Sequence, residues 1–309
     1  MDERVLVTGG CGFLGQHLVR RLAAAGMRVD VVDIQEPPTD FPARSVIADV
    51  RDWLPTTTAS YDLVIHLAAF VGGRTSIENK PMEVAGNIAI DHSLFEYLGR
   101  AGCGRLVYLS SSAVYPIDRQ QAPGNSPLAE SEVNVRRGPF GVPDLTYGWA
   151  KLTGEFMGTL LADSHGIPVV IYRPFSVYGP GQADSYPMTA IMRRALDRQD
   201  PLTVWGSGLQ HRDFVYIDDF LNIVLETYAS QPSTVPLNIA TGTGKSFRDI
   251  ARIMADTVGY SPEFRHDSTQ PEGVLWRVGS ADSLNPSLQP AVALEEGIKH
   301  LAKHLRGIA

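Results

Sequence analysis

Three glycines spaced three residues apart separate an apolar run from an amphipathic segment at the start of the chain. Gly9, Gly12 and Gly15 lie in TGGCGFLG (8–15). This stretch joins the end of the run RVLVTGG (4–10) to the start of a segment (13–26) that has apolar residues at helical spacing. A strand that turns directly into a helix needs glycine where backbone approaches a pyrophosphate and where helix and sheet pack closely. This order predicts a phosphate loop for a dinucleotide, and the alternative is an ordinary strand–helix turn.

Five further apolar runs follow the glycine turn at intervals that suit alternating strands and helices. They are 28–33, 45–50, 63–69, 105–111 and 168–175. Nearly continuous apolar runs indicate strands covered on both faces, as in a parallel sheet, and helical segments are expected near 81–101 and 147–165. We therefore predict an α/β fold with a Rossmann-type doubly wound parallel sheet. The length of 309 residues disfavours a closed eight-stranded barrel.

An acidic residue at the end of the second predicted strand indicates which dinucleotide is bound. Asp33 ends the run 28–33, where a carboxylate takes the ribose hydroxyls of the adenosine half. A carboxylate there would repel a 2′-phosphate, and no arginine follows in DIQEPP, so NAD is favoured over NADP. Asp49, in ADVRD, is a second candidate for the adenine edge.

The rhythm of the pattern changes after about residue 176, where glycine, proline and polar residues become more frequent. We expect a smaller, partly interleaved C-terminal region that binds substrate. Residues 1–175 are assigned to an NAD-binding Rossmann domain, to which 213–245 return, and 176–309 mainly to the substrate-binding region. The Pro/Gly-rich segment 116–143 is predicted to be a functional loop.

Composition and charge exclude several classes of protein. The formal net charge of -7, without a basic run, argues against a nucleic-acid partner. Two cysteines, Cys11 and Cys103, cannot form a disulfide framework or a metal-binding cysteine cluster. The chain starts directly with a predicted strand, without the pattern of a signal peptide, and has no apolar run long enough for a bilayer. These features favour a cytoplasmic protein with no membrane partner.

Two local patterns resemble binding sites without satisfying their requirements. ATGTGKS (240–246) lacks the spacing of an ATP phosphate loop, because Ile239 stands where the first glycine is needed. We expect a turn before a helix that begins near Ser246. His300 and His304 are one helical turn apart, but no third ligand is evident, so no metal site is predicted. His66 is expected to be structural.

A tyrosine and a lysine four residues apart suggest proton transfer. In DLTYGWAK (144–151), Tyr147 and Lys151 would lie one turn apart on the same face of a helix. A free tyrosine, with a pKa near 10, is a poor base at neutral pH. A nearby ammonium and a positively charged nicotinamide ring favour the phenolate and make Tyr147 a candidate general base.

A cluster of serines ends the fifth predicted strand. In YLSSSAVYP (108–116), Ser111 is our choice for the hydroxyl that holds the substrate, with Ser110 and Ser112 as alternatives. Side chains at the carboxyl ends of strands point into the crevice where ligands bind in open α/β sheets. The serines are therefore expected beside Tyr147.

Taken in order, these motifs resemble the extended short-chain dehydrogenase/reductases that act on nucleotide sugars, the epimerase/dehydratase family. The resemblance runs from residue 4 to about 245 and is carried by TGGCGFLG (8–15), Asp33, HLAA (66–69), SSSAVY (110–115), YGWAK (147–151), RPFSVYGPG (173–181) and RDFVYIDD (212–219). It implies that Tyr147 is the general base, that Lys151 binds the nicotinamide ribose and that Ser111 is the third catalytic group. It also implies a nucleotide-diphosphate sugar as substrate and a homodimer formed through the helices near 81–101 and 147–165.

The resemblance further implies the residues that bind each ligand. Those for NAD are Gly9, Gly12, Phe13, Leu14, Gly15, Asp33, Ile34, Asp49, Val50, Leu67, Ala68, Ala69, Tyr147, Lys151 and Phe175. Those for the substrate are Ser111, Ser112, Tyr147, Ser176, Arg212 and Arg277, with Arg212 on the diphosphate. The family usually has asparagine at the position of Ser176. Trp149 stands where a small residue is common and is expected to narrow the pocket.

The residues after the first two serines help to distinguish reactions within the family. Dehydratases resemble Thr-Asp-Glu-Val-Tyr here, and decarboxylases usually keep the glutamate, whereas this chain has Ser112 and Ala113. AAFVGG (68–73) and VYP (114–116) are similar to GDP-fucose synthase and GDP-mannose 3,5-epimerase, but those enzymes carry a cysteine at the position of Ala113. The reductases of this branch also consume NADPH, which Asp33 disfavours.

The remaining set of residues favours inversion of C4 by a nucleotide-sugar epimerase, through a transient 4-keto intermediate with Tyr147 as base. A 4-ketoreductase, a decarboxylase, a 4,6-dehydratase and a dinucleotide-binding sensor or scaffold stay open as alternatives. The nucleotide base and the sugar cannot be read from the motifs. Arg119, Arg136 and Arg137, in the loop 116–143, are candidates to decide the sugar.

Overall fold

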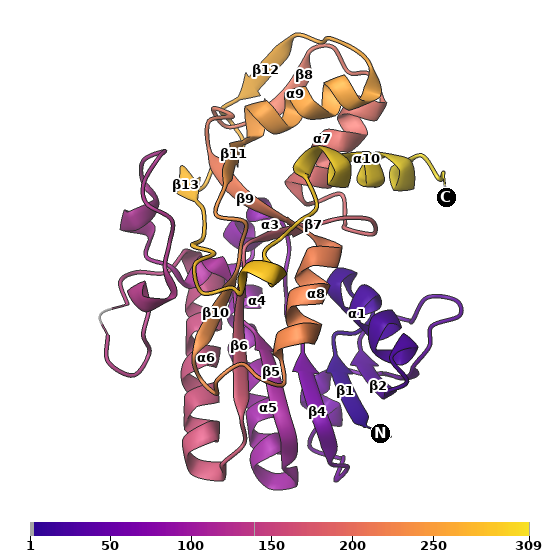
Figure 1. Cartoon of the computed structure of the whole chain (residues 1–309), viewed down its shortest axis with the longest axis vertical. Helices are drawn as coiled ribbons and strands as arrows, with labels where there is room; N and C mark the ends of the chain where they lie inside the picture. Colours follow the sequence, from indigo (N-terminus) through magenta and orange to yellow (C-terminus); the bar gives the residue numbers. More distant parts are fainter. Residues whose placement is uncertain (1–2, 139, 309) are drawn as a thin grey trace.

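A parallel sheet forms the centre of the computed structural model, which describes residues 3–138 and 140–308. Its seven strands lie in the order β10-β6-β5-β4-β1-β2-β3. Their bounds are β1 Arg4–Thr8, β2 Arg28–Asp33, β3 Arg44–Ile47, β4 Tyr61–His66, β5 Cys103–Leu109, β6 Val169–Pro174 and β10 Pro236–Ile239. All six apolar runs predicted as strands lie in this sheet, so the predicted α/β fold is confirmed (Figure 1).

The strand order reverses beside β1, which pairs in parallel with both β2 and β4. In a doubly wound sheet this reversal opens a crevice at the carboxyl ends of the two strands that flank it. Alternating residues of β1 face opposite sides of the sheet, as the pleat requires. Val5 and Val7 pack with Leu18 in one core cluster, and Leu6 packs with Leu94 in another. Both faces of the sheet are thus buried, as the apolar runs predicted.

Helices cover each face of the sheet. On one side lie α1 (Phe13–Ala24) and α8 (Ile217–Thr227), and on the other α2 (Val50–Trp53), α5 (Asn87–Ala101) and α6 (Leu145–His165). The helix predicted near 81–101 is divided at Gly86 into α4 (Pro81–Ala85) and α5. A further short helix, α3 (Arg74–Asn79), was not expected from the sequence.

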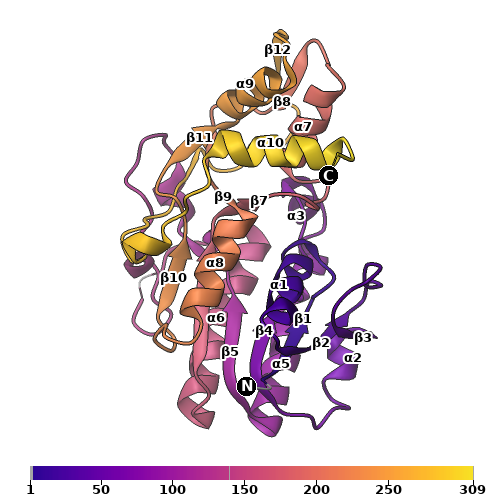
Figure 2. The same cartoon turned by 45° about the vertical axis from the view of Figure 1, so that its right-hand side comes forward.

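The remaining elements form a second region above the sheet, called here the upper region (Figures 1 and 2). They are β7 Ser176–Tyr178, α7 Pro187–Leu196, β8 Leu202–Trp205, β9 His211–Tyr216, β11 Gly244–Ser246, α9 Phe247–Val258, β12 Phe264–Asp267, β13 Trp276–Arg277 and α10 Leu294–Leu305. Strand β9 pairs with β7, β11 and β13, and β8 pairs with β12. The predicted start of a helix near Ser246 is confirmed, since the Ser246 hydroxyl accepts the Asp249 amide at the N-terminus of α9. The residues directly before it form the strand β11, where a turn was expected.

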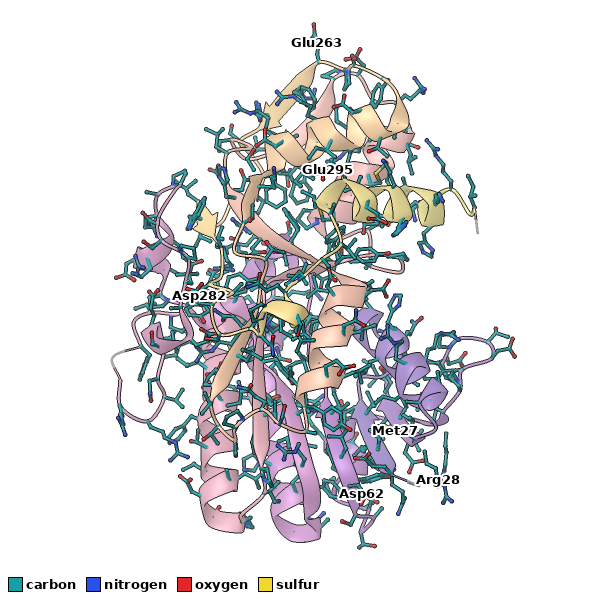
Figure 3. The ribbon with its side chains drawn as sticks, viewed as in Figure 1. Met27, Arg28, Asp62, Glu263, Asp282 and Glu295 are labelled. Atoms are coloured by element: carbon teal, nitrogen blue, oxygen red, sulfur yellow. The ribbon has the colours of Figure 1, made fainter. Side chains whose placement is uncertain are left out.

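The direction of the strands sets where a ligand can bind. Arg28, the first residue of β2, and Asp62, near the start of β4, lie at the end of the sheet remote from the upper region (Figure 3). Glu263 lies at the far end of the upper region. The carboxyl ends of the strands therefore face the upper region. Among the described residues, no helix combines the length and apolarity that crossing a membrane requires.

The loop 116–143 contains the short 3-10 helices Ile117–Gln120 and Glu130–Glu132, and two others, Ser112–Val114 and Pro286–Leu288, lie elsewhere. Backbone hydrogen bonds tie Leu128 to Val278 and Ser280, so part of the loop packs against the C-terminal segment. Pro139, which belongs to the predicted functional loop 116–143, lies outside the described residues.

Candidate active site

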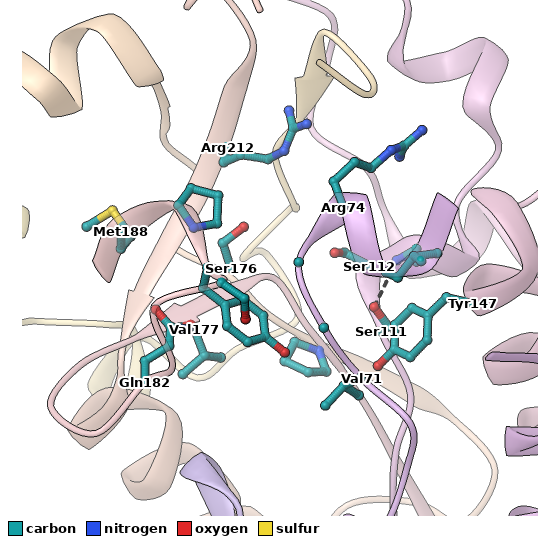
Figure 4. A pocket seen from close by; sticks show the side chains of 18 of the residues that line it. Val71, Arg74, Ser111, Ser112, Tyr147, Ser176, Val177, Gln182, Met188 and Arg212 are labelled. Carbon is teal, nitrogen blue, oxygen red and sulfur yellow. Dashed lines mark hydrogen bonds between the residues drawn. The ribbon is translucent and has the colours of Figure 1, made fainter. Parts of the chain in front are cut away.

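A cavity of about 510 Å³ lies between the carboxyl ends of the sheet and the upper region (Figure 4). It brings together most of the residues predicted for cofactor and substrate from the sequence. Those that line it are Gly9, Gly12, Phe13, Leu14, Gly15, Leu67, Ala69, Ser111, Ser112, Tyr147, Lys151, Phe175, Ser176, Arg212 and Arg277. The glycine turn and the catalytic candidates therefore share one continuous space.

The glycine turn has the close contacts that explain its composition. Gly9 has a φ of +72°, and a Cβ there would lie 2.5 Å from the amide nitrogen of Ala68. A Cβ on Gly15 would clash with the carbonyl oxygen of Gly9. A Cβ on Gly12, by contrast, would lie 3.5 Å from its nearest neighbour, the carbonyl oxygen of Gly9. The absence of a side chain at Gly12 therefore leaves space on the cavity side. Since Gly12 precedes α1, the open N-terminus of that helix fits a pyrophosphate.

Five residues predicted for the cofactor do not line the cavity: Asp33, Ile34, Asp49, Val50 and Ala68. Asp33 nevertheless contacts the glycine turn, because its Oδ2 accepts the Cys11 amide at 2.8 Å and its Oδ1 accepts the Gln35 amide at 2.9 Å. Ile34, the next residue, is 70% exposed. A carboxylate beside the turn, followed by an exposed apolar side chain, suits an adenosine ribose and the adjacent base.

Asp49 is engaged within its own helix. Its Oδ1 accepts the Arg51 amide at 2.9 Å, and its Oδ2 lies 2.6 Å from Arg51 Nη2. The hydrogen bond from Arg51 is the main reason that the pKa of Asp49 is lowered. Val50 is buried in the core, so its side chain cannot contact a ligand.

Tyr147 and Lys151 lie one turn apart on α6, as predicted, with the Lys151 Nζ 6.0 Å from the centre of the Tyr147 ring. Burial is the main cause that raises the pKa of Tyr147 above its ordinary value, with further contributions from Tyr186 and Asp91. A hydrogen bond with Ser111 acts in the opposite direction. The protein alone therefore keeps Tyr147 protonated, and additional positive charge is needed to make it a base.

The structure distinguishes the three serines. Ser110 is buried, and its hydroxyl donates to Glu155 Oε1 at 2.5 Å. Ser111 instead points toward Tyr147, and its Oγ accepts the Ala113 amide at 3.1 Å, the dashed line in Figure 4. Ser111 is therefore the serine whose hydroxyl is available beside the tyrosine, and Ser112 lines the same wall.

Three arginines line the cavity, and two of them share the carboxylate of Asp144. Asp144 Oδ2 accepts Arg74 Nη1 at 2.8 Å and Arg277 Nη2 at 2.6 Å. A Cβ on Gly273 would lie 3.3 Å from both Arg74 Nη1 and Arg212 Nη2, so these guanidinium groups lie close together. Figure 4 shows that Arg212 and Arg74 extend from two different segments of the chain. Arg74 is also paired with Glu78, whose Oε1 lies 2.5 Å from Arg74 Nε. Arg212 donates to the carbonyls of His211 and Val274 and has no carboxylate partner among the described residues, so its guanidinium group can receive an anion.

The charges in this cluster affect one another. Burial, followed by the positive charge of Arg277, lowers the pKa of Arg212 to about 9. Burial by itself would raise the pKa of Asp144, but Arg277 and Arg74 offset this, and the net effect is a lowered pKa. Asp144 is therefore a carboxylate at neutral pH, and a bound anion would relieve the repulsion among the arginines.

Arg74 was missed by the sequence reasoning, although it directly follows the AAFVGG segment that had been noticed. The signal available was a cation placed after two glycines in the loop that follows β4. Its ion pair with Asp144 joins residues 70 positions apart in the chain, which sequence spacing cannot reveal.

Two expectations about the pocket wall were wrong. Trp149 does not narrow the cavity, because it lies on the outer face of α6 and is 45% exposed. No described residue of the loop 116–143 lines the cavity either. Arg119 is paired with Glu132 at 2.7 Å and Arg136 with Asp163 at 2.6 Å, so both arginines are held elsewhere.

The loop acts on the site indirectly through one residue. Gln120 is fully buried, and its Oε1 accepts Arg277 Nε at 2.7 Å. Its amide nitrogen donates to the carbonyls of Tyr115 and Pro116. The loop therefore helps to orient Arg277 without contacting the cavity.

The chain is similar to other proteins over nearly its whole length. The family model described as the NAD dependent epimerase/dehydratase family matches residues 5–240. The UDP-glucose epimerase YtcB of Bacillus subtilis (strain 168) is 31% identical, covering 99% of this chain and 98% of its own. GDP-mannose 3,5-epimerase 1 of Oryza sativa subsp. indica is 29% identical, covering 96% of this chain and 80% of its own.

A solved structure is similar as well. MoeE5 in complex with UDP-glucose and NAD is 28% identical, with a TM-score of 0.82, and 99% of each chain is covered. The similarity thus extends through the upper region and beyond the sheet that carries the glycine turn.

Proposed function

The chain belongs to the NAD dependent epimerase/dehydratase family, and we propose that it is an NAD-dependent nucleotide-sugar epimerase that inverts C4. The observation that carries this proposal is the convergence of Tyr147, Ser111 and Lys151 on one cavity in which the lining carboxylates are already engaged. Inversion at C4 through a 4-keto sugar requires a base for the hydroxyl proton and a hydride that leaves and returns. Elimination of water also requires a carboxylic acid or a comparable proton donor.

The described carboxylates that line the cavity are Asp144, Asp184 and Glu272. Asp144 binds two arginines, as described above. Asp184 Oδ1 accepts Arg193 Nε at 2.8 Å, and Glu272 Oε1 accepts the amide of Ser207 at 3.1 Å. Dehydratases and decarboxylases resemble one another in carrying a carboxyl group at the position of Ala113. In this chain the position holds a buried methyl group. This arrangement supports epimerisation over dehydration and decarboxylation.

The chain's own residues perform the proton transfers in this proposal. Ser111 holds the 4-hydroxyl of the sugar, and Tyr147 removes its proton, helped by the positive charge of Lys151. NAD, when bound, would supply the acceptor that keeps the C4 hydride until the sugar has turned. The 4-keto sugar then turns within the cavity, and Tyr147 returns the proton to the oxygen after the opposite face has been reduced.

The residues around the glycine turn fit NAD. Gly9 and Gly15 leave no space for a Cβ, whereas Gly12 opens the N-terminus of α1 toward the cavity. Asp33 has a carboxylate that can accept the ribose hydroxyls of NAD. The same negative charge would repel the 2′-phosphate of NADP. We assign the remaining predicted cofactor residues to this site as part of the proposal, with Asp49 and Val50 acting only through the position of α2.

The three-arginine cluster is assigned to the substrate diphosphate. Arg212 and Arg277 were expected there from the sequence, and Arg74 joins them in the proposal because it shares the Asp144 carboxylate with Arg277. A diphosphate supplies the negative charge that Arg212 lacks, since Arg212 has no carboxylate partner among the described residues. Ser112 lies beside Ser111 and Tyr147 on the lining and is assigned to the sugar, and Ser176, on the side of Arg212, is assigned to the substrate as well.

The active form is proposed to be a homodimer. Trp149, Phe156 and Leu160 of α6 are 45%, 46% and 49% exposed, and Ile88 of α5 is 38% exposed. Spacings of seven and four residues place the three α6 side chains on one face of that helix. An exposed apolar stripe of this kind fits the same stripe on a second copy better than it fits water.

A substrate screen tests the proposed reaction. Purified protein would be incubated with UDP-, GDP-, dTDP- and CDP-sugars and catalytic NAD, and products analysed by mass spectrometry and proton NMR. The expected product has unchanged mass and an inverted C4, and a Tyr147→Phe variant does not form it. Loss of water or carbon dioxide would support a dehydratase or decarboxylase. Stoichiometric consumption of a reduced nicotinamide cofactor would support a reductase. Binding of NAD without turnover of any nucleotide sugar would support a sensor or scaffold.

A further inference from the structure

Lys151 lies in a nearly dry environment that disfavours its charge. Its side chain is on α6, and the residue is 3% exposed. Burial is the main cause that lowers the pKa of its ammonium, and the charges of Asp91 and Glu155 act in the opposite direction. The titratable groups that face it are Asp91 of α5, Tyr108 of β5, and Tyr147 and Glu155 of α6. Which of the two carboxylates balances the ammonium decides how the site is charged.

Glu155 already has a partner. Its Oε2 accepts Arg173 Nη2 at 2.7 Å, and its Oε1 accepts Arg173 Nε at 2.8 Å. The two residues are completely buried. A bidentate pair of this kind neutralises both charges. Glu155 therefore has little negative charge left to balance Lys151.

Asp91 has hydrogen-bond partners but no cation among them. Its Oδ1 contacts His66 Nε2 at 3.0 Å, and its Oδ2 accepts the Tyr108 hydroxyl at 2.6 Å. Asp91 and both partners are fully buried. Burial is the main cause that raises the pKa of Tyr108 far above its ordinary value, so this phenol remains a donor. The charge of Asp91 depends on the protonation of His66.

The neighbours of His66 assign its proton. Thr8 Oγ1 accepts the Ala68 amide at 3.4 Å and lies 2.6 Å from His66 Nδ1. With the amide donating to its oxygen, the Thr8 hydroxyl is free to donate to Nδ1. The single ring proton then lies on Nε2 and is donated to Asp91, which makes the imidazole neutral. In this arrangement Asp91 accepts from two neutral donors, the His66 ring and the Tyr108 phenol.

Tyr108 connects this charge to Lys151. The Lys151 Nζ lies 5.0 Å from the centre of the Tyr108 ring, within the range of a cation–π contact. A Cβ on Gly154, three residues further along α6, would clash with the Tyr108 hydroxyl and lie 2.5 Å from Asp91 Oδ2. The helix that carries Lys151 therefore rests directly on the Asp91–Tyr108 pair.

We propose that Asp91 is the counter-ion of the Lys151 ammonium and acts through the ring of Tyr108. A phenol that donates its proton toward a carboxylate has a more electron-rich ring, which strengthens the attraction for a cation over its face. Asp91 is thus a positioning residue, since it touches neither the cavity nor its ligands. The inference rests on the proposed function for its catalytic consequence, because that function gives Lys151 its role beside Tyr147.

The charge of Asp91 has predictable consequences for both catalytic groups. It raises the pKa of Lys151 and also that of Tyr147. In Asp91→Asn, the ammonium loses its stabilising charge and the phenolate loses a repelling one, so both pKa values fall. The rising and falling limbs of the pH profile of kcat/KM therefore both move to lower pH, by about one unit. A purely structural role for Asp91 would reduce stability without moving the limbs.

The direct test is an NMR titration of the lysine Nζ in protein labelled with 15N-lysine, with Lys151→Arg to assign the signal. In Asp91→Asn, we expect Lys151 to lose its proton at a pH about one unit lower than in wild type. Tyr108→Phe keeps the ring but removes the hydroxyl, and is expected to give a smaller shift in the same direction. It also serves if Asp91→Asn does not fold.

A second tyrosine–aspartate pair provides the control. The Tyr61 hydroxyl donates to Asp30 at 2.9 Å near the amino end of the sheet, remote from Lys151. Asp30→Asn should lower stability but leave the Lys151 titration unchanged. Wild-type titration of Lys151 in both Asp91→Asn and Tyr108→Phe would overturn the proposal. Because the titration needs no substrate, a shifted midpoint in a protein that epimerises nothing would separate this inference from the proposed reaction.

Discussion

The Nη2 atom of Arg277 lies 2.6 Å from Oδ2 of Asp144, which joins β13 of the upper region to the residue preceding α6. Asp144 stands three residues before Tyr147, so the group that would orient an arginine for the proposed diphosphate site is fixed to the helix that carries the proposed base. The same carboxylate holds Arg74 from the loop after β4. In the proposed function, binding of the diphosphate and placement of the base therefore share one structural element.

Arg74→Gln is expected to weaken substrate binding. A charge-assisted hydrogen bond contributes about 1.5–3 kcal/mol, so KM for the nucleotide sugar should rise at least about tenfold while kcat changes little. Steady-state kinetics and calorimetric NAD binding measure the two effects separately. Arg119→Gln breaks an ion pair outside the cavity and is the matched control. An unchanged KM in Arg74→Gln would remove Arg74 from the diphosphate site.

Neighbouring serines should respond differently to removal of their hydroxyls. Ser111→Ala is expected to lower kcat by about 10²-fold with little change in melting temperature, because the hydroxyl beside Tyr147 is lost. Ser110→Ala leaves buried Glu155 without one donor and should lower the free energy of unfolding by about 1–3 kcal/mol. Kinetics and thermal unfolding of both variants test the assignment, and a larger loss of kcat in Ser110→Ala would reverse it.

The glycines of the turn should divide into structural and ligand-facing positions. Gly12→Ala has space for the new methyl group and should fold with nearly wild-type stability, yet bind NAD at least about tenfold more weakly. Gly9→Ala places a side chain at positive φ against the Ala68 backbone and should lower the melting temperature strongly. NAD titration and thermal unfolding measure these effects. Unimpaired NAD binding by Gly12→Ala would place the pyrophosphate elsewhere.

The apolar stripe on α6 should control the oligomeric state. Phe156→Glu puts a charge in the centre of the proposed interface and is expected to convert a dimer into a monomer in sedimentation velocity experiments. Val235 is similarly exposed, at 50%, but lies before β10, so Val235→Glu should leave the dimer intact. A wild-type monomer, or a Phe156→Glu dimer, would contradict the assignment of this stripe.

Much of the sheet could be predicted because its signals are local. Each of the first six strands is a nearly continuous apolar run, and the glycine turn marks the junction of β1 and α1. The division of the expected helix into α4 and α5 at Gly86 left no clear signal, since the apolar pattern continues across it. The short helix α3 was missed for the related reason that six residues hold too little periodicity.

Sequence spacing predicted which catalytic candidates lie together on one helix. It did not predict contacts between residues that are far apart in the chain. Tyr147 and Lys151 share a helix, so their relation follows from spacing alone. The shared carboxylate of Arg74 and Arg277 and the pairing of Asp91 with Tyr108 depend on residues from separate elements that meet only in the folded chain. Trp149 was misplaced because a position one residue from the buried face of a helix can point outward.

The central claim is that hydride leaves and returns to the same carbon beside Tyr147. The most direct measurement uses the nucleotide sugar identified in the screen, carrying deuterium at C4, with catalytic NAD in ordinary water. We expect a C4-inverted product that retains the deuterium at C4, and no such product with Tyr147→Phe. Deuterium lost to solvent, or inversion that persists in Tyr147→Phe, would contradict the account.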